Sequence, residues 1–175
     1  MSKARLYIPF ALALAVQLVM LGAVPFKKIM PKIAGTTVVL KIEPVDPYHS
    51  FKGYYLDLRY EISRPKPAAQ WNDLARNAIV YTVLARGDDG FWHAVSVHDR
   101  RPETLDEGAV VIRGRKKHSR INYGIEAYYV PEEVRGAIER DLRGHIDKAR
   151  AEVAVGPFGN AVILRLRVGN RTYEY

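Results

Sequence analysis

An uncharged segment near the amino terminus limits what this chain can fold into more than any other feature. It runs from Leu6 to Phe26, and Gln17 is its only strongly polar residue. As a helix it would reach roughly 30 Å at about 1.5 Å per residue, which matches the hydrocarbon core of a bilayer. Pro9 falls in its first turn and Pro25 at its exit, where a helix tolerates proline. The segment therefore predicts a transmembrane helix over 6–26, between a flank at 1–5 and a connector at 27–35.

A cleaved signal peptide is the alternative interpretation of the same segment. Lys3 and Arg5 precede the apolar run, and Gly22 and Ala23 are small, as a signal peptidase requires. The run is nevertheless longer than the usual apolar region of about 7–15 residues, and no small-x-small site precedes Pro25. We therefore expect an uncleaved, single-pass anchor that holds the chain in a lipid bilayer.

Basic residues flank the apolar segment on both sides. Lys3 and Arg5 lie before it, and three lysines follow it, at Lys27, Lys28 and Lys32. The positive-inside rule assigns the flank with more Lys and Arg to the cytoplasm, and the two flanks here carry nearly the same positive charge. The flanks alone therefore leave the orientation open.

Beyond residue 35 the sequence alternates between apolar and polar residues in short runs joined by turn residues, which is typical of antiparallel strands. The runs are 36–43, 78–86 with 91–97, 110–115 with 121–130, and 152–155 with 162–168. One helix is expected from Pro131 to Ala149, where apolar residues form a single stripe. The sequence thus predicts an α+β fold: the transmembrane helix, then a mainly antiparallel β domain over 36–175, barrel-like or sandwich-like, with one substantial helix.

A further strand is predicted after the turn-forming pair Asp46-Pro47. From Gly53 onward, one side of an extended chain would carry the residues Tyr54, Leu56, Leu58, Tyr60 and Ile62, and the other side Tyr55, Asp57, Arg59 and Glu61. We expect one long, two-faced strand that ends near Ile62 and pairs antiparallel with the 36–43 strand.

The octapeptide Gly53-Tyr54-Tyr55-Leu56-Asp57-Leu58-Arg59-Tyr60 resembles the signature of the GDYXXLXY protein family, a set of small membrane-anchored bacterial proteins. Gly53, Tyr55, Leu58 and Tyr60 match its Gly, first Tyr, Leu and second Tyr, whereas Tyr54 stands where the family has Asp. The segment 120–132 also resembles the family layout. The resemblance implies an amino terminus inside the cell, a carboxyl-terminal domain outside the cytoplasm, and another membrane or envelope protein as partner. It implies no reaction.

Few residues suggest catalysis or ligand binding. The five histidines have no partners at metal-ligand spacing, and no glycine-rich phosphate loop is present, so we expect neither a metal site nor a cofactor. Ser50 with Lys52 offers the alternative of a membrane-anchored hydrolase resembling signal peptidases, but the Ser-x-x-x-Pro arrangement of such enzymes is absent. The carboxylates of Asp57, Glu61 and Glu126 are expected to pair with Arg59 and Arg120 across strands. No catalytic residue is assigned.

Tyrosines concentrate in the two segments that resemble the family, and tyrosine suits both packing and interfaces. We predict a partner-binding surface around Gly53, Tyr55, Asp57, Arg59 and Tyr123. The alternative is that these tyrosines only build the core. The net charge of +8 and the basic cluster at 113–118 suit an anionic surface, but they match no RNA-binding motif, so nucleic acid is not expected. The predicted function is therefore that of a membrane-anchored accessory or interaction module of the cell envelope.

Overall fold

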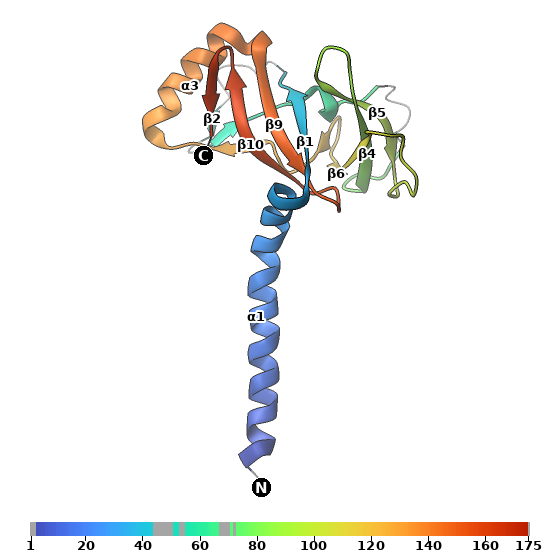
Figure 1. Cartoon of the computed structure of the whole chain (residues 1–175), viewed down its shortest axis with the longest axis vertical. Helices are drawn as coiled ribbons and strands as arrows, with labels where there is room; N and C mark the ends of the chain where they lie inside the picture. The colour runs from blue at the N-terminus through green and yellow to red at the C-terminus, as the bar shows by residue number, and fades with distance from the viewer. Residues whose placement is uncertain (1–2, 44–50, 53–54, 67–70, 72, 175) are drawn as a thin grey trace.

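Helix α1 (Lys3–Ala34) extends away from a β-rich domain in the computed structural model, which describes residues 3–43, 51–52, 55–66, 71 and 73–174 (Figure 1). Alanine and leucine, both strong helix formers, dominate its central part. The helix is longer than expected, because it continues through the predicted connector and leaves only Gly35 before the first strand. In the described part of the chain, no helix combines the length and the apolarity of a membrane span.

The first sheet has the strand order β1 (Thr36–Lys41), β9 (Ala149–Val155), β10 (Ala161–Val168) and β11 (Arg171–Tyr173). The predicted strand at 36–43 and the predicted carboxyl-terminal hairpin are confirmed, while β11 was not predicted. The expected pairing of β1 with the signature strand is wrong. All of β1 pairs with β9, and the chain meets the signature segment just beyond the end of β1, where Ile42 forms a bridge with Tyr60 and the N–H of Glu43 donates to the carbonyl of Arg59.

The second sheet has the order β5 (Trp92–His98), β4 (Ile79–Arg86), β6 (Val110–Lys116) and β7 (Ile121–Asn122). The β4–β5 hairpin confirms the turn predicted at 87–90. A bulge sets Val83 opposite Ser96 and Leu84 opposite Ala94, so Val95 has no partner in the ladder. Val95 is therefore exposed while Val97, two residues further along, is buried.

The third sheet is small and joins β2 (Phe51–Lys52), β3 (Tyr55–Asp57) and β8 (Ala127–Tyr129). The predicted long strand therefore ends at Asp57, and Glu61–Ser63 form a 3-10 helix, η1. The predicted strand at 121–130 is likewise divided between β7 and β8. Gly124, with φ of +82°, turns the chain between these two strands, so they belong to different sheets.

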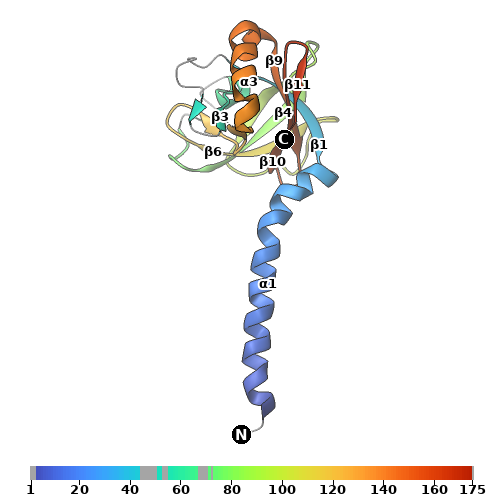
Figure 2. The same cartoon turned by 90° about the vertical axis from the view of Figure 1, so that its left-hand side faces the viewer.

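The core lies where the three described sheets and α3 (Glu132–His145) meet, with α3 on the side away from β4, β5 and β6 (Figures 1 and 2). Helix α3 starts directly after Pro131, as predicted, and buries Ile138 completely. It ends earlier than expected, because residues Ile146–Lys148 form a 3-10 turn, η2. The mainly antiparallel α+β fold is confirmed. The barrel alternative is wrong for the described strands, since none of their sheets closes on itself.

The packing around Gly114 generates a prediction about stability. A Cβ atom at position 114 would lie 2.5 Å from Ile121 Cγ2 and 2.8 Å from Tyr123 Cδ1. Both neighbours are buried, so they cannot move away freely. We expect Gly114→Ala to lower the free energy of unfolding by about 1–3 kcal/mol, measured by denaturant titration of the full chain in detergent.

The matched control is Gly136→Ala in α3, where the added Cβ would meet only Arg140 Nη1 at an ordinary 3.7 Å. That variant is expected to raise the free energy of unfolding by up to about 1 kcal/mol, because alanine is the better helix former. Equal stability of the two variants would contradict the tight packing at Gly114.

Candidate functional site

The outer side of the small sheet carries two of the predicted binding residues, Tyr55 and Asp57, and Arg59 follows two residues after β3. Tyr55 on β3 lies opposite Tyr129 on β8, and the two ring centroids are 5.8 Å apart with the planes tilted by 51°. Tyr129 is 67% exposed and Tyr55 is half-buried. We call the surface made by Tyr55, Asp57, Arg59 and Tyr129 the tyrosine face. Tyrosine and arginine are both enriched at protein interfaces.

The inner side of the same segment belongs to the core. Leu56, Leu58, Tyr60 and Ile62 are at most 2% exposed. On β8 the alternation is the same, because Tyr128 is buried and its hydroxyl donates to the carbonyl of Tyr173 at 3.0 Å. The predicted two-faced pattern is therefore confirmed, although the chain leaves the ladder after Asp57.

Tyr123 lies in the core, although it was predicted to belong to the binding surface. It is 5% exposed, and its hydroxyl donates to the carbonyl of Ile62 at 2.8 Å and lies 3.0 Å from the hydroxyl of Thr82. Burial raises the pKa of the Tyr123 phenol, so it stays protonated and remains a donor. Through its hydrogen bond to Ile62, Tyr123 supports the end of the segment at 55–62, which carries the family signature. It is not part of the tyrosine face.

Several predicted residues lie outside what the structure describes. Gly53 and Ser50 are outside the described residues, as are the side chains of Lys52 and of the flanking residues Lys3, Arg5, Lys27 and Lys28. Lys32 is described and is exposed. The Ser50 and Lys52 alternative therefore stays a prediction.

Arg59 is half-buried at the edge of the tyrosine face. Its Nε is buried and has no acceptor among the described residues. Buried donors normally have a partner, because an unmet one loses its hydrogen bonds to water without replacement.

Glu126 lies behind the tyrosine face and shapes the turn between β7 and β8. Its Oε1 accepts the backbone N–H of Tyr123 at 2.6 Å, and its Oε2 accepts that of Gly124 at 2.9 Å. Burial raises the pKa of the Glu126 carboxyl, and the nearby Asp57 adds to the increase, while the backbone N–H groups oppose it. The expected ion pair with an arginine is replaced by bonds to the backbone. Since both oxygens already accept hydrogen bonds, the carboxylate holds the turn.

A second cluster fastens η1 to the β4–β5 hairpin. His93 Nδ1 lies 2.9 Å from Glu61 Oε1, and His93 Nε2 lies 3.0 Å from Asp89 Oδ1. Lys41 Nζ is 4.0 Å from the other oxygen of Glu61. We call this group the His93 clamp. Hydrogen bonds to Asp89 and Glu61 raise the pKa of His93, and the bond to His93 lowers the pKa of Asp89.

The His93 clamp limits what His93 can do chemically. Both ring nitrogens face carboxylates, so the protonated ring donates twice and has no free nitrogen to act as a general base. In the described part of the chain no three histidine, aspartate or glutamate side chains are arranged to hold a metal ion. Sequence reasoning missed the clamp, because Glu61 was expected to pair with arginine. In the sequence, only the position of Asp89, four residues before His93 across the hairpin turn, indicates one of the contacts in the clamp.

A model of the GDYXXLXY protein family matches residues 17–166. The chain belongs to this family. The match begins inside α1 and ends inside β10, so it includes α3 and the described strands of all three sheets except β11 and the end of β10. Neither the curated proteins nor the solved structures yielded a significant match.

The family signature has two roles in this fold. Leu58 and Tyr60 point inward and are 2% and 0% exposed, so these two positions build the core. Tyr55 points outward onto the tyrosine face. One short segment therefore supplies both part of the hydrophobic core and the candidate binding surface.

The His93 clamp generates a prediction about pH. Because the folded-state pKa of His93 is raised, its contribution to stability is fully present below the ordinary value of 6.5 and is lost as the pH rises through the raised pKa. The pKa of Asp89 is lowered, so its contribution is present above its ordinary value of 3.8 and is lost only as the pH falls through the lowered pKa. The difference in Tm between the wild type and His93→Gln should be largest at about pH 5.5 and should shrink by at least about half at about pH 9.

His98→Gln is the control for this experiment, because it removes an exposed imidazole from the same strand. We expect it to change Tm little at either pH, as exposed substitutions usually do. A Tm difference for His93→Gln that stays constant with pH would show that the clamp does not depend on a charged imidazole.

Proposed function

We propose that this chain is a membrane-anchored interaction module of the cell envelope, and that a partner protein binds its tyrosine face. The observation that carries the proposal is the outward pair of Tyr55 and Tyr129 on the signature segment, with Tyr129 67% exposed. Tyrosine and arginine are enriched where partner proteins bind most strongly. The exposed ring of Tyr129 beside the half-buried ring of Tyr55 offers apolar contact area to a partner, and fixing a tyrosine side chain on binding costs little conformational entropy.

The charged members of the tyrosine face support binding rather than catalysis. Arg59 is half-buried, and a guanidinium can donate several N–H groups to a carbonyl or carboxylate of a partner. The nearest carboxylate with a raised pKa, Glu126, is occupied by two backbone N–H groups. The residues present thus favour recognition of another protein's surface.

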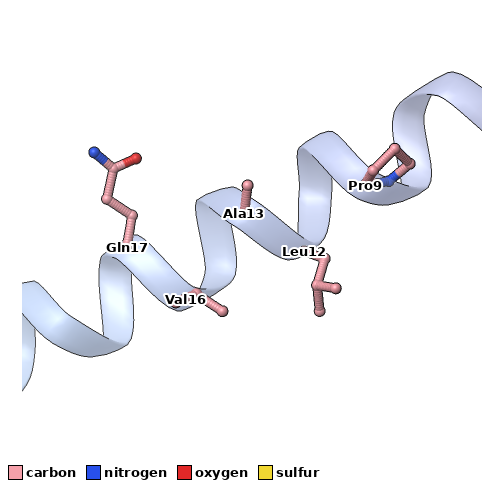
Figure 3. Close-up of a pocket in the computed structure, with 5 residues that line it drawn as sticks. All are labelled: Pro9, Leu12, Ala13, Val16 and Gln17. Atoms are coloured by element: carbon pink, nitrogen blue, oxygen red, sulfur yellow. The ribbon is translucent and has the colours of Figure 1, made fainter.

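The anchor in this proposal is α1. Phe10, Leu14, Leu18 and Leu21 are each at least 48% exposed, and α1 stands clear of the domain over most of its length (Figure 1). Pro9, Leu12, Ala13, Val16 and Gln17 line a shallow hollow on the surface of α1, and Figure 3 shows that all five side chains come from this helix. Each large apolar side chain left in water forgoes about 1.5–3 kcal/mol of burial, so an apolar surrounding would stabilise this helix. We place the amino terminus in the cytoplasm and the domain outside it, as the family resemblance implies.

The anchor is tested by extracting membranes with carbonate and determining the amino terminus of the mature chain. We expect the chain to stay in the membrane pellet with residues 6–26 intact, because an apolar helix of bilayer length is not removed by high pH. A mature protein that starts near residue 24 and is released by carbonate would contradict the anchor and establish a signal peptide.

The tyrosine face is tested by photo-crosslinking in intact cells. A photoreactive amino acid at position 129 should give a discrete adduct of one mass, whereas the same group at position 95, on β5 and 50% exposed, should not. The double variant Tyr55→Ala/Arg59→Ala should lower the yield of that adduct at least about tenfold if it removes two central contacts.

Thermal melts of the same variants separate binding from folding. Loss of the adduct at an unchanged Tm supports the tyrosine face, and loss of the fold without any adduct at position 129 contradicts it. If Ser50→Ala abolished a proteolytic phenotype while the adduct pattern stayed the same, the hydrolase alternative would replace the module.

A further inference from the structure

The turn between β9 and β10 lies beside the domain end of α1. A Cβ atom on Gly156 would lie 3.3 Å from Pro31 Cα, and one on Gly35 would lie 2.9 Å from the carbonyl oxygen of Val155. Figure 1 shows the ends of β9 and β10 pointing toward the top of α1. Whatever surrounds the end of α1 therefore also lies close to this turn.

The turn carries an aromatic side chain at its tip. Phe158 is 63% exposed, between the exposed Pro157 and the buried Gly159. Gly159 has φ of +78°, and its carbonyl accepts the backbone N–H of Arg113 at 2.8 Å. The turn is thus fixed to β6, and Phe158 is held outward.

A row of cations, which we call the β6 cations, continues from this turn along β6 and one residue past its end. Arg113, Arg115 and Lys117 alternate with buried residues and are all exposed. Arg115 Nη1 donates to the carbonyl of Asn77 at 2.9 Å, and Lys117 Nζ lies 3.0 Å from Asn77 Oδ1, so both partners are neutral. Within the described part of the chain no ion pair joins any of the three to a carboxylate. No carboxylate of the described residues therefore neutralises their positive charge.

We propose that the β9–β10 turn and the β6 cations form a second contact with the bilayer that holds α1, with Phe158 in the interfacial layer and Arg113, Arg115 and Lys117 against anionic lipid headgroups. This inference rests on the proposed anchor. An aromatic ring beside cations is the combination that the membrane interface favours, and the cations are attracted to anionic lipid.

The length of α1 places the turn at the correct depth. From Phe26, the last apolar residue of the run, to Pro31 a helix rises roughly 7.5 Å at about 1.5 Å per residue. The headgroup layer on each side of a bilayer is about 5–8 Å thick. A turn packed on Pro31 therefore lies at the level of the headgroups. The exposed Lys32 lies at the same level.

The absence of cysteine from the sequence allows a direct measurement of depth. Single-cysteine variants of the full chain, labelled with a polarity-sensitive fluorophore, are reconstituted into vesicles of phosphatidylcholine with or without phosphatidylglycerol. Pro157→Cys reports on the turn and leaves Phe158 in place. Val16→Cys reports on α1. Asp147→Cys, exposed and at the other end of β9, is the control, roughly 20 Å away along the strand at about 3.3 Å per residue.

The depth of each fluorophore is measured by how strongly lipids with a spin label near the headgroup quench its fluorescence. We expect the label at 157 to be quenched at least about twofold more than the label at 147 in the phosphatidylglycerol vesicles, and the label at 16 to be quenched by deeper spin labels. Phe158→Ser, or Arg113→Gln with Arg115→Gln and Lys117→Gln, should remove most of the difference at 157. Circular dichroism would check that these exposed substitutions leave the fold unchanged.

Two results would overturn the inference, and each is distinct from failure of the anchor. Quenching at 16 with equal, weak quenching at 157 and 147 would leave the anchor in place and put the turn in water. Equal quenching at 157 in neutral and anionic vesicles would exclude the role of the cations. If the label at 16 were also not quenched, the proposed anchor itself would be wrong.

Discussion

Two buried tyrosines hold the signature segment in place, and the rest of the domain depends on their hydrogen bonds. The hydroxyl of Tyr60 donates to the carbonyl of Ile125 at 2.8 Å, and that of Tyr123 donates to the carbonyl of Ile62 at 2.8 Å. These carbonyls lie outside every strand, so the phenols replace a sheet ladder. Burial raises the pKa of both phenols, so they stay donors. The segment that contains Tyr60 and Ile62 and the segment that contains Tyr123 and Ile125 therefore remain joined where the chain passes from one sheet to the next.

This joint explains how one short segment serves both the core and a surface. Leu58 and Tyr60 are fixed inward by packing and hydrogen bonding, so Tyr55 must lie on the opposite side of the extended chain. The N–H of Leu58 donates to the carbonyl of Glu126, and the His93 clamp fastens Glu61, directly after Tyr60, to the β4–β5 hairpin. A rigid support of this kind keeps an exposed aromatic pair in one geometry, which lowers the conformational cost of binding a partner.

The junction between α1 and the domain is equally constrained. Gly35 is the only residue between α1 and β1, and a Cβ atom there would lie 2.2 Å from the carbonyl oxygen of Pro31. The β9–β10 turn packs on the same proline. A junction without a flexible linker fixes the direction of the sheets relative to the helix. A bilayer around α1 would therefore meet one defined end of the domain, while the tyrosine face would keep a defined direction of its own.

The sequence by itself determined the features that arise from local chemistry. The helical propensity of α1, the turn at 87–90, the start of α3 after Pro131 and the alternation from Tyr55 to Ile62 all depend on neighbours along the chain. Only the tertiary structure decided that β1 pairs with β9, that the 121–130 strand divides at Gly124, that Tyr123 is buried and that Glu61 meets His93. Strand pairing and burial depend on residues far apart in sequence. Alternation of apolar and polar residues predicts that a strand has two faces, but it does not predict which other strand will cover each face.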